Sequence, residues 1–183
     1  MLTIALAVFF FPLPLSMQLI LASSALLLVA PGIVASLGGA PYVVTPRRIL
    51  ERMMDWAQIR RGDIVYDLGC GDGRLVFEAA RRGAKATGYE LSLPTYALAK
   101  GRSIFHKDAT IALKNFWKQD YRDADVVFCF LQQHSMARFQ QTIWPTLKPG
   151  CRVVSHAFPM PGVEADRREG DVVMYRKTSR VPR

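Results

Sequence analysis

Hydrophobic residues fill the start of the chain without a single charged position. No Asp, Glu, Lys or Arg occurs between Met1 and Pro46. Residues 16–37 form the longest apolar run, and about 20 apolar residues are enough to cross the hydrocarbon core of a bilayer. The pattern therefore predicts a single-pass membrane protein, with one transmembrane helix over residues 16–37 inside an anchor of residues 1–40.

Two alternatives to a single span remain open. The apolar run before Pro12 allows a two-pass hairpin or a re-entrant segment. A cleaved signal peptide would begin with basic residues, which are absent here. Arg47 and Arg48 follow the apolar run instead, and the positive-inside rule then places the catalytic domain on the cytoplasmic, or matrix-equivalent, side.

From residue 47 onward, short β-rich runs alternate with stretches in which apolar residues recur at helical spacing. Thr45 and Pro46 are typical of a helix start, with Thr45 as the N-cap and Pro46 as the first helical residue. This helix belongs to a linker, residues 41–61, ahead of a folded domain, residues 62–183. Helices are also predicted over 73–82, 93–107 and 135–147, and strands over 64–68, 85–91, 109–114, 125–131, 151–158 and 172–175.

This alternation predicts an α/β, Rossmann-like domain with a mostly parallel twisted sheet and helices on both faces. The run DVVFCFL is apolar at nearly every position, as expected for a strand covered on both sides. Cys70, Cys129 and Cys151 lie in predicted strands or at their edges, and the sequence contains no CxxC motif. We interpret them as core thiols, and we expect no metal site.

The basic residues are confined to the folded part of the chain, so the net charge of +9 belongs to residues 47–183. On a domain held at a membrane, each well-placed Lys or Arg gains about 1 kcal/mol from anionic headgroups. An anionic lipid surface is therefore an expected partner. Nucleic acid is less favoured, because the sequence has no RNA-binding signature and no regular interleaving of aromatic and basic residues.

A glycine-rich run, VYDLGCGDGR at residues 65–74, follows the first predicted strand and opens a helix. In this loop of Gly69, Cys70 and Gly71, the glycines let a ligand approach the backbone closely. A dinucleotide fingerprint would place glycine where Arg74 stands, and no phosphate-loop motif occurs. Asp67 would repel a diphosphate and suits a cation instead, such as the ammonium group of an amino acid.

Two further segments complete the expected ligand site. Glu90 ends the second strand, about 20 residues beyond the glycines, where a carboxylate accepts ribose hydroxyls. Its alternative role is that of a solvated or capping carboxylate. Asn115 and Phe116 follow the third strand and could contact an adenine ring, although Phe116 is nearly as typical of a core aromatic.

A ligand with an ammonium group, a ribose and an adenine but no phosphate is S-adenosylmethionine. Over residues 47–177 the segments resemble class I methyltransferases, which use this cofactor. A narrower resemblance is to the membrane-anchored lysine methyltransferases of mitochondria, which act on adenine nucleotide translocase and the ATP synthase c-subunit, and to their archaeal and bacterial relatives. It is carried by PYVVTP, VYDLGCGDGR, GYEL, NFWK, LKPGCRVVSH and FPMPG.

This resemblance implies that the PYVVTP segment lies over the active site, where Tyr42 and Thr45 help to close the pocket. It also implies cofactor binding by Asp67, Gly69, Cys70, Gly71, Glu90, Asn115 and Phe116. The sequence departs from the family pattern in having Val44 for a proline and Val163 for a tryptophan, and the second change puts the target-lysine pocket in doubt.

Residues after the fourth and fifth strands are expected to face the methyl acceptor. Gln132 could orient an amine through its carbonyl, and His156 lies beside the predicted cleft. His134 is interpreted as a surface or capping residue. The segment lacks the [DN]PP[YF] motif used on exocyclic base amines. The leading hypothesis is a protein-lysine N-methyltransferase that acts on a membrane-associated protein. The alternatives are a lipid or quinone methyltransferase and a cofactor-binding module without turnover.

Overall fold

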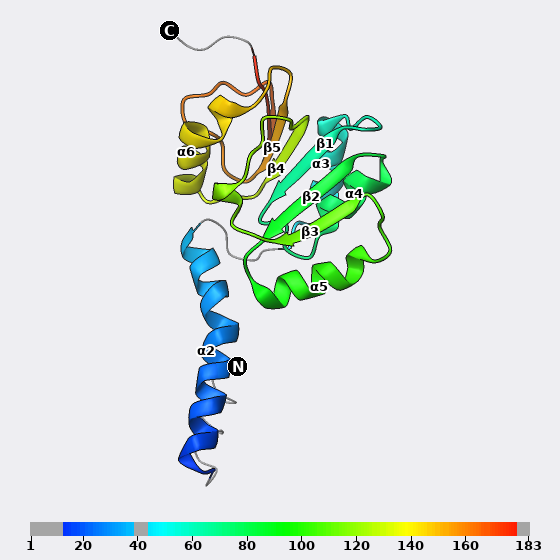
Figure 1. Ribbon diagram of the computed structural model, residues 1–183. Coiled ribbons are helices and arrows are strands. Elements are labelled where there is room, and N and C mark those ends of the chain that lie inside the picture. Colours follow the sequence, from blue (N-terminus) through cyan, green and yellow to red (C-terminus); the bar gives the residue numbers. More distant parts are fainter. Residues whose placement is uncertain (1–12, 39–43, 179–183) are drawn as a thin grey trace.

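The computed structural model describes residues 13–38 and 44–178, and its centre is one seven-stranded sheet (Figure 1). The strand order is β3-β2-β1-β4-β5-β7-β6. The strands are β1 (Ile64–Leu68), β2 (Lys85–Glu90), β3 (Ala109–Leu113), β4 (Val126–Cys129), β5 (Arg152–His156), β6 (Arg167–Glu169) and β7 (Val172–Arg176).

The sheet is mostly parallel, which confirms the predicted fold. Neighbours from β3 through β5 all run parallel, whereas β7 pairs with β5 and with β6 in antiparallel fashion. The order reverses direction between β1 and β4, because the chain first builds outward to β3 and then crosses to the other side of β1. At such a switch point the carboxyl ends of the strands leave room for a ligand.

Helices cover both faces of this sheet. They are α2 (Leu15–Gly38), α3 (Arg47–Ala57), α4 (Arg74–Arg81), α5 (Leu93–Ser103) and α6 (Gln133–Thr142), with short 3₁₀ turns η1 (Phe116–Lys118) and η2 (Trp144–Thr146). Buried residues of α3, α4 and α5 form one core with side chains such as Val65 and Ile111. Buried residues of α6 form a second core on the opposite face with Leu68 and Val153.

Most predicted elements are present with shorter bounds, and two differences have clear causes. The helix predicted over 135–147 begins at Gln133 and ends at Thr142, and the chain continues as η2, which contains Pro145. Strand β6 is absent from the sequence prediction, because Arg167–Glu169 is short, polar and fully exposed. Such an edge strand has no apolar pattern that a sequence analysis can detect.

The prediction that Thr45 caps the first domain helix was wrong. Helix α3 begins at Arg47 with Pro46 at the N-cap position, and no side chain caps it. Thr45 is nevertheless buried, for a reason described below. Helix α3, which falls within the predicted linker, packs into the domain core through Met53, Met54 and Trp56.

Helix α2 covers the residues predicted to span a membrane, contacts α5 and projects away from the domain (Figure 1). None of the helices in the described part of the chain combines the length and the apolarity that a membrane crossing requires. The predicted span is therefore not supported.

Candidate active site

The glycine loop joins β1 to α4 and is held against the end of β2. The amides of Gly69 and Cys70 both donate to the carbonyl of Tyr89, at 3.0 and 2.9 Å. Gly69 has φ +80°, and a Cβ atom added there would meet no neighbour within 4 Å. The loop backbone therefore faces open space at Gly69, in a conformation that other residues rarely adopt. A ligand can approach the backbone directly at this point.

Glu90 closes the other side of this space and is fixed by backbone amides. Its Oε2 atom accepts from the amide of Gly71 at 3.0 Å, and its Oε1 atom accepts from the amides of Leu91 and Ser92, both at 2.8 Å. The carboxylate is buried. Because a carboxylate has about four acceptor positions, Oε2 retains one that suits a ribose hydroxyl. The interactions also connect the glycine loop to the carboxyl end of β2.

Asp67 is buried at the end of β1, within electrostatic reach of Glu90 and Asp72. Burial is the main cause that raises the pKa of Asp67, to about 8, and the nearby charges of Glu90 and Asp72 raise it further. Without a cation nearby, the side chain is mostly protonated at neutral pH. A ligand ammonium group would favour the carboxylate form.

The sequence analysis missed a set of charged contacts behind the glycine loop. Asp72 pairs with Arg74 and with Arg102 of α5, each with a closest N···O distance of 2.8 Å. These guanidinium groups hold the pKa of Asp72 below its usual range, against the effect of burial. The Nη1 atom of Arg74 donates to the carbonyl of Thr45 at 2.8 Å. The segment before α3 is thereby tied to the cofactor loop.

The predicted adenine-side residues have clear structural roles. The Oδ1 atom of Asn115 accepts from the amide of Trp117 at 2.9 Å and caps η1. Phe116 is buried in the core on the α6 face, and its carbonyl accepts from the hydroxyl of Tyr121 at 2.6 Å. Cys70 is also a core residue, since its thiol packs against Gly88.

The acceptor side lies at the carboxyl ends of β4 and β5. Gln132 occupies the N-cap position of α6, where its side chain forms no capping hydrogen bond. The imidazole of His156 packs against Phe130, with ring centroids 4.1 Å apart. Ala157 follows with φ +70°, and the turn leaves Phe158 36% exposed. These side chains place aromatic, uncharged surface beside the end of β5.

His156 has an unsatisfied buried atom. Its Nδ1 finds no hydrogen-bond partner among the described residues, although the side chain is buried. Burial lowers the pKa of this imidazole, and Asp171 opposes that change only in part. The ring is therefore neutral at pH 7. A buried polar atom left unpaired is uncommon and is often functional. Tyr42, the other predicted catalytic residue, lies outside the described residues.

Comparison with known proteins agrees with this geometry. The family model described as the ANTKMT methyltransferase domain matches residues 67–167. The chain is 37% identical over 129 residues to a protein-lysine N-methyltransferase from Saccharolobus islandicus, and the match covers 67% of this chain and 79% of that protein. The chain belongs to the ANTKMT methyltransferase family.

Two further relatives of this ANTKMT-family protein extend the comparison. The lysine N-methyltransferase of Rattus norvegicus that is named for the ATP synthase c-subunit is 32% identical over 134 residues, which is 72% of this chain but only 62% of the rat protein. An RNA methyltransferase from Salinibacter ruber, solved with S-adenosylhomocysteine, has a TM-score of 0.72 at 28% identity, and the match covers 76% of this chain and 97% of that one.

As a member of this family, the protein is an S-adenosylmethionine-dependent methyltransferase. The residues present fit the cofactor, because Gly69 opens the loop, Glu90 offers an acceptor atom and the buried Asp67 suits an ammonium group. When bound, S-adenosylmethionine supplies an electrophilic methyl group. We expect the amino-acid end to lie at Asp67 and the ribose at Glu90.

Proposed function

We propose that the protein is a protein-lysine N-methyltransferase that acts on a membrane-associated protein. The observation that carries the proposal is the 37% identity to the protein-lysine N-methyltransferase of Saccharolobus islandicus, over two thirds of this chain. The family match spans both the cofactor side at Asp67 and the acceptor side at His156. The rat relative is named for the c-subunit of ATP synthase, a further reason to propose a protein substrate.

The acceptor side suits an amine that must react in its neutral form. Against a lysine pKa near 10.4, removing the proton costs about 4–5 kcal/mol at pH 7. A carboxylate beside the amine would raise that cost by stabilising the ammonium form. Phe130 and the neutral His156 instead present uncharged surface. We propose that His156 accepts a hydrogen bond from the lysine amine and orients its lone pair.

Replacing His156 by glutamine should lower kcat by about a hundredfold, in line with the loss of a positioned acid–base group. The KM for S-adenosylmethionine should be unchanged. In the wild type, protonation of His156 should remove activity only below the ordinary histidine pKa near 6.5, because burial lowers its pKa. This acidic limb of the kcat profile should disappear in the variant.

His134→Gln is the matched control, since His134 lies exposed on the first turn of α6. Its rate and pH profile should equal those of the wild type. Equal rates in His156→Gln, or an acidic limb that survives there, would remove His156 from the acceptor site.

We also propose that the protein is located at a membrane through α2, with its catalytic domain on the cytoplasmic or matrix-equivalent side. This helix contains no charged residue. Its large apolar side chains are exposed to solvent, among them Leu15, Leu19 and Leu26. Burying such side chains against lipid is favourable by about 1.5–3 kcal/mol each.

The acceptor can be identified by transfer of labelled methyl groups. Full-length protein is incubated with labelled S-adenosylmethionine and membranes from a strain that lacks the gene. The proposal predicts label in a protein band, on lysine by mass spectrometry. Label only in the organic phase would indicate a lipid or quinone acceptor, and label only in RNA a nucleic-acid acceptor. Saturable cofactor binding with no transfer would indicate a non-catalytic module. Any of these three results would overturn the proposal.

A further inference from the structure

Helix α5 ends in an exposed apolar patch that the fold does not require. Phe105 is 85% exposed, Ile104 is 79% exposed and Leu98 is 54% exposed. The chain after α5 is instead secured by His106, which stacks on Phe77 with ring centroids 4.5 Å apart. Two adjacent large apolar residues in water forgo the free energy that burial would give. Exposed patches of this kind often mark an interaction surface.

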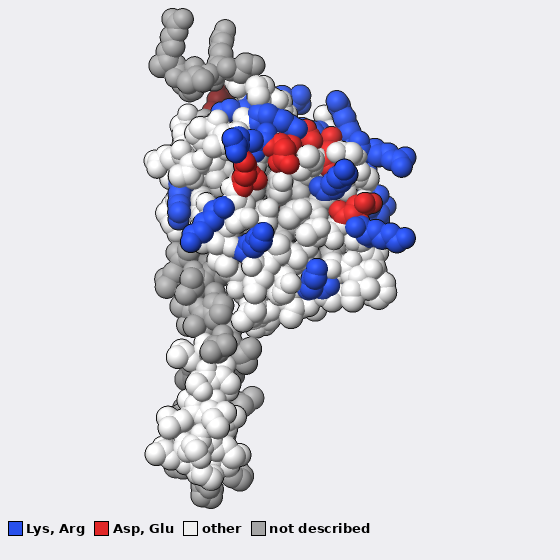
Figure 2. Space-filling view, in the orientation of Figure 1, with Lys and Arg blue, Asp and Glu red and all other residues white. Residues whose placement is uncertain are grey.

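Basic side chains surround this patch, and acidic ones are absent from it. Residues 91–107 contain Lys100, Arg102 and Lys107 but no Asp or Glu. Arg102 is committed to Asp72, whereas the ammonium groups of Lys100 and Lys107 form no ion pair with the described residues. In Figure 2, the lowest part of the domain, where α5 lies, shows no acidic side chain on the visible face.

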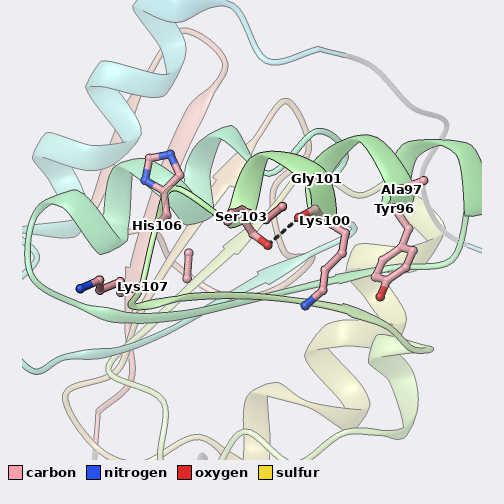
Figure 3. Close-up of a pocket in the computed structure, with 9 residues that line it drawn as sticks. Tyr96, Ala97, Lys100, Gly101, Ser103, His106 and Lys107 are labelled. Atoms are coloured by element: carbon pink, nitrogen blue, oxygen red, sulfur yellow. Dashed lines mark hydrogen bonds between the residues drawn. The ribbon is translucent and has the colours of Figure 1, made fainter.

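A shallow groove of about 650 Å³ runs along α5 beside Ala109, at the start of the edge strand β3. Figure 3 shows Tyr96 and Lys100 extending from the same side of the helix into this region, with Lys107 beyond them on the loop. Both lysines can therefore reach outward while their alkyl stems cover apolar surface.

The position of α2 indicates which partner fits this surface. The uncharged helix α2 contacts α5 and leaves the domain at the end where α5 lies across it (Figure 1). A lipid surface that receives α2 would therefore meet α5 as well. Lysine ammonium groups at the headgroups and apolar side chains below them are the pattern of an interfacial helix.

We propose that Leu98, Ile104 and Phe105, together with Lys100 and Lys107, form a second membrane contact that docks on an anionic lipid bilayer. This contact, called here the α5 patch, fixes the orientation of the domain, which α2 alone would leave free to rotate. Because α5 begins at the carboxyl end of β2, the same orientation directs the cofactor loop towards the membrane. The inference rests on the proposed membrane location and is independent of the methyl acceptor.

A fluorescent label at Phe105 tests the contact directly. The native cysteines Cys70, Cys129 and Cys151 are buried, so an introduced surface cysteine can be labelled selectively. Full-length Phe105→Cys carrying a polarity-sensitive fluorophore is mixed with phosphatidylcholine vesicles with or without phosphatidylglycerol. We expect blue-shifted, enhanced emission with the anionic vesicles. Arg168→Cys, on the exposed strand β6, is the matched control and should stay in water.

Charge reversal provides a test that does not depend on the label. Lys100→Glu/Lys107→Glu should weaken partitioning onto anionic vesicles by about tenfold or more. Arg168→Glu/Arg176→Glu makes the same charge change at the opposite edge of the sheet and should have a smaller effect. Cofactor binding should be unchanged in both variants, which separates a failure of this inference from a failure of the methyltransferase proposal.

Three results would overturn the inference. The first is full-length protein that does not bind vesicles. The second is a label at position 105 that remains as water-exposed as the label at position 168, which would leave the α5 patch to a protein partner. The third is equal partitioning of the two charge-reversal variants.

Discussion

Replacing Glu90 by alanine should eliminate measurable binding of S-adenosylmethionine. Two losses combine in this variant. The cofactor loses a charged acceptor for a ribose hydroxyl, and such a hydrogen bond contributes about 1.5–3 kcal/mol. The amide of Gly71 also loses its partner at 3.0 Å, so the glycine loop is no longer held to the end of β2. Isothermal titration calorimetry with S-adenosylhomocysteine should show affinity reduced by about a hundredfold or more.

Controls separate lost binding from lost folding. Glu90→Gln keeps the size of the side chain and should remain folded, with affinity still well below that of the wild type. Glu164→Ala removes an exposed carboxylate away from the loop and should bind as the wild type does. Wild-type affinity in a folded Glu90 variant would remove the ribose assignment.

The Asp67→Asn variant should be more stable than the wild type without cofactor and bind the cofactor poorly. The folded-state pKa of Asp67 is raised from 3.8 to about 8. The folded protein therefore holds this proton more tightly than the unfolded chain does. Its contribution to stability is fully present below pH 4 and is lost as pH rises towards 8, by at most about 1.4 kcal/mol per pH unit. Asparagine removes this pH-dependent loss.

Thermal unfolding from pH 4 to pH 9 measures this effect. The melting temperature of Asp67→Asn should rise above that of the wild type as pH increases, with the gap constant above about pH 8. Wild-type affinity for the cofactor should increase up to the same pH, because binding an ammonium group releases the proton of Asp67. Asp108→Asn, at an exposed position, is the control. A variant that binds normally would show that Asp67 does not contact the cofactor.

Much of this protein was accessible from local sequence patterns. Alternating apolar runs predicted the parallel sheet, because strand and helix periodicities are local properties of the chain. Asp67 and Glu90 could be placed together because each ends a strand, and the ends of adjacent parallel strands meet at one edge. The glycine run predicted a cofactor loop, and the family match confirms the cofactor.

The tertiary structure decided what depends on contacts between distant segments. In the sequence Arg74 is notable only for replacing a glycine, yet packing brings its guanidinium to the carbonyl of Thr45 and to Asp72. The unpaired Nδ1 of His156 and the exposed end of α5 likewise depend on what neighbouring elements do or do not cover. Periodicity determines which residues can be buried, but only the assembled fold determines which polar atoms find partners and which apolar side chains remain in water.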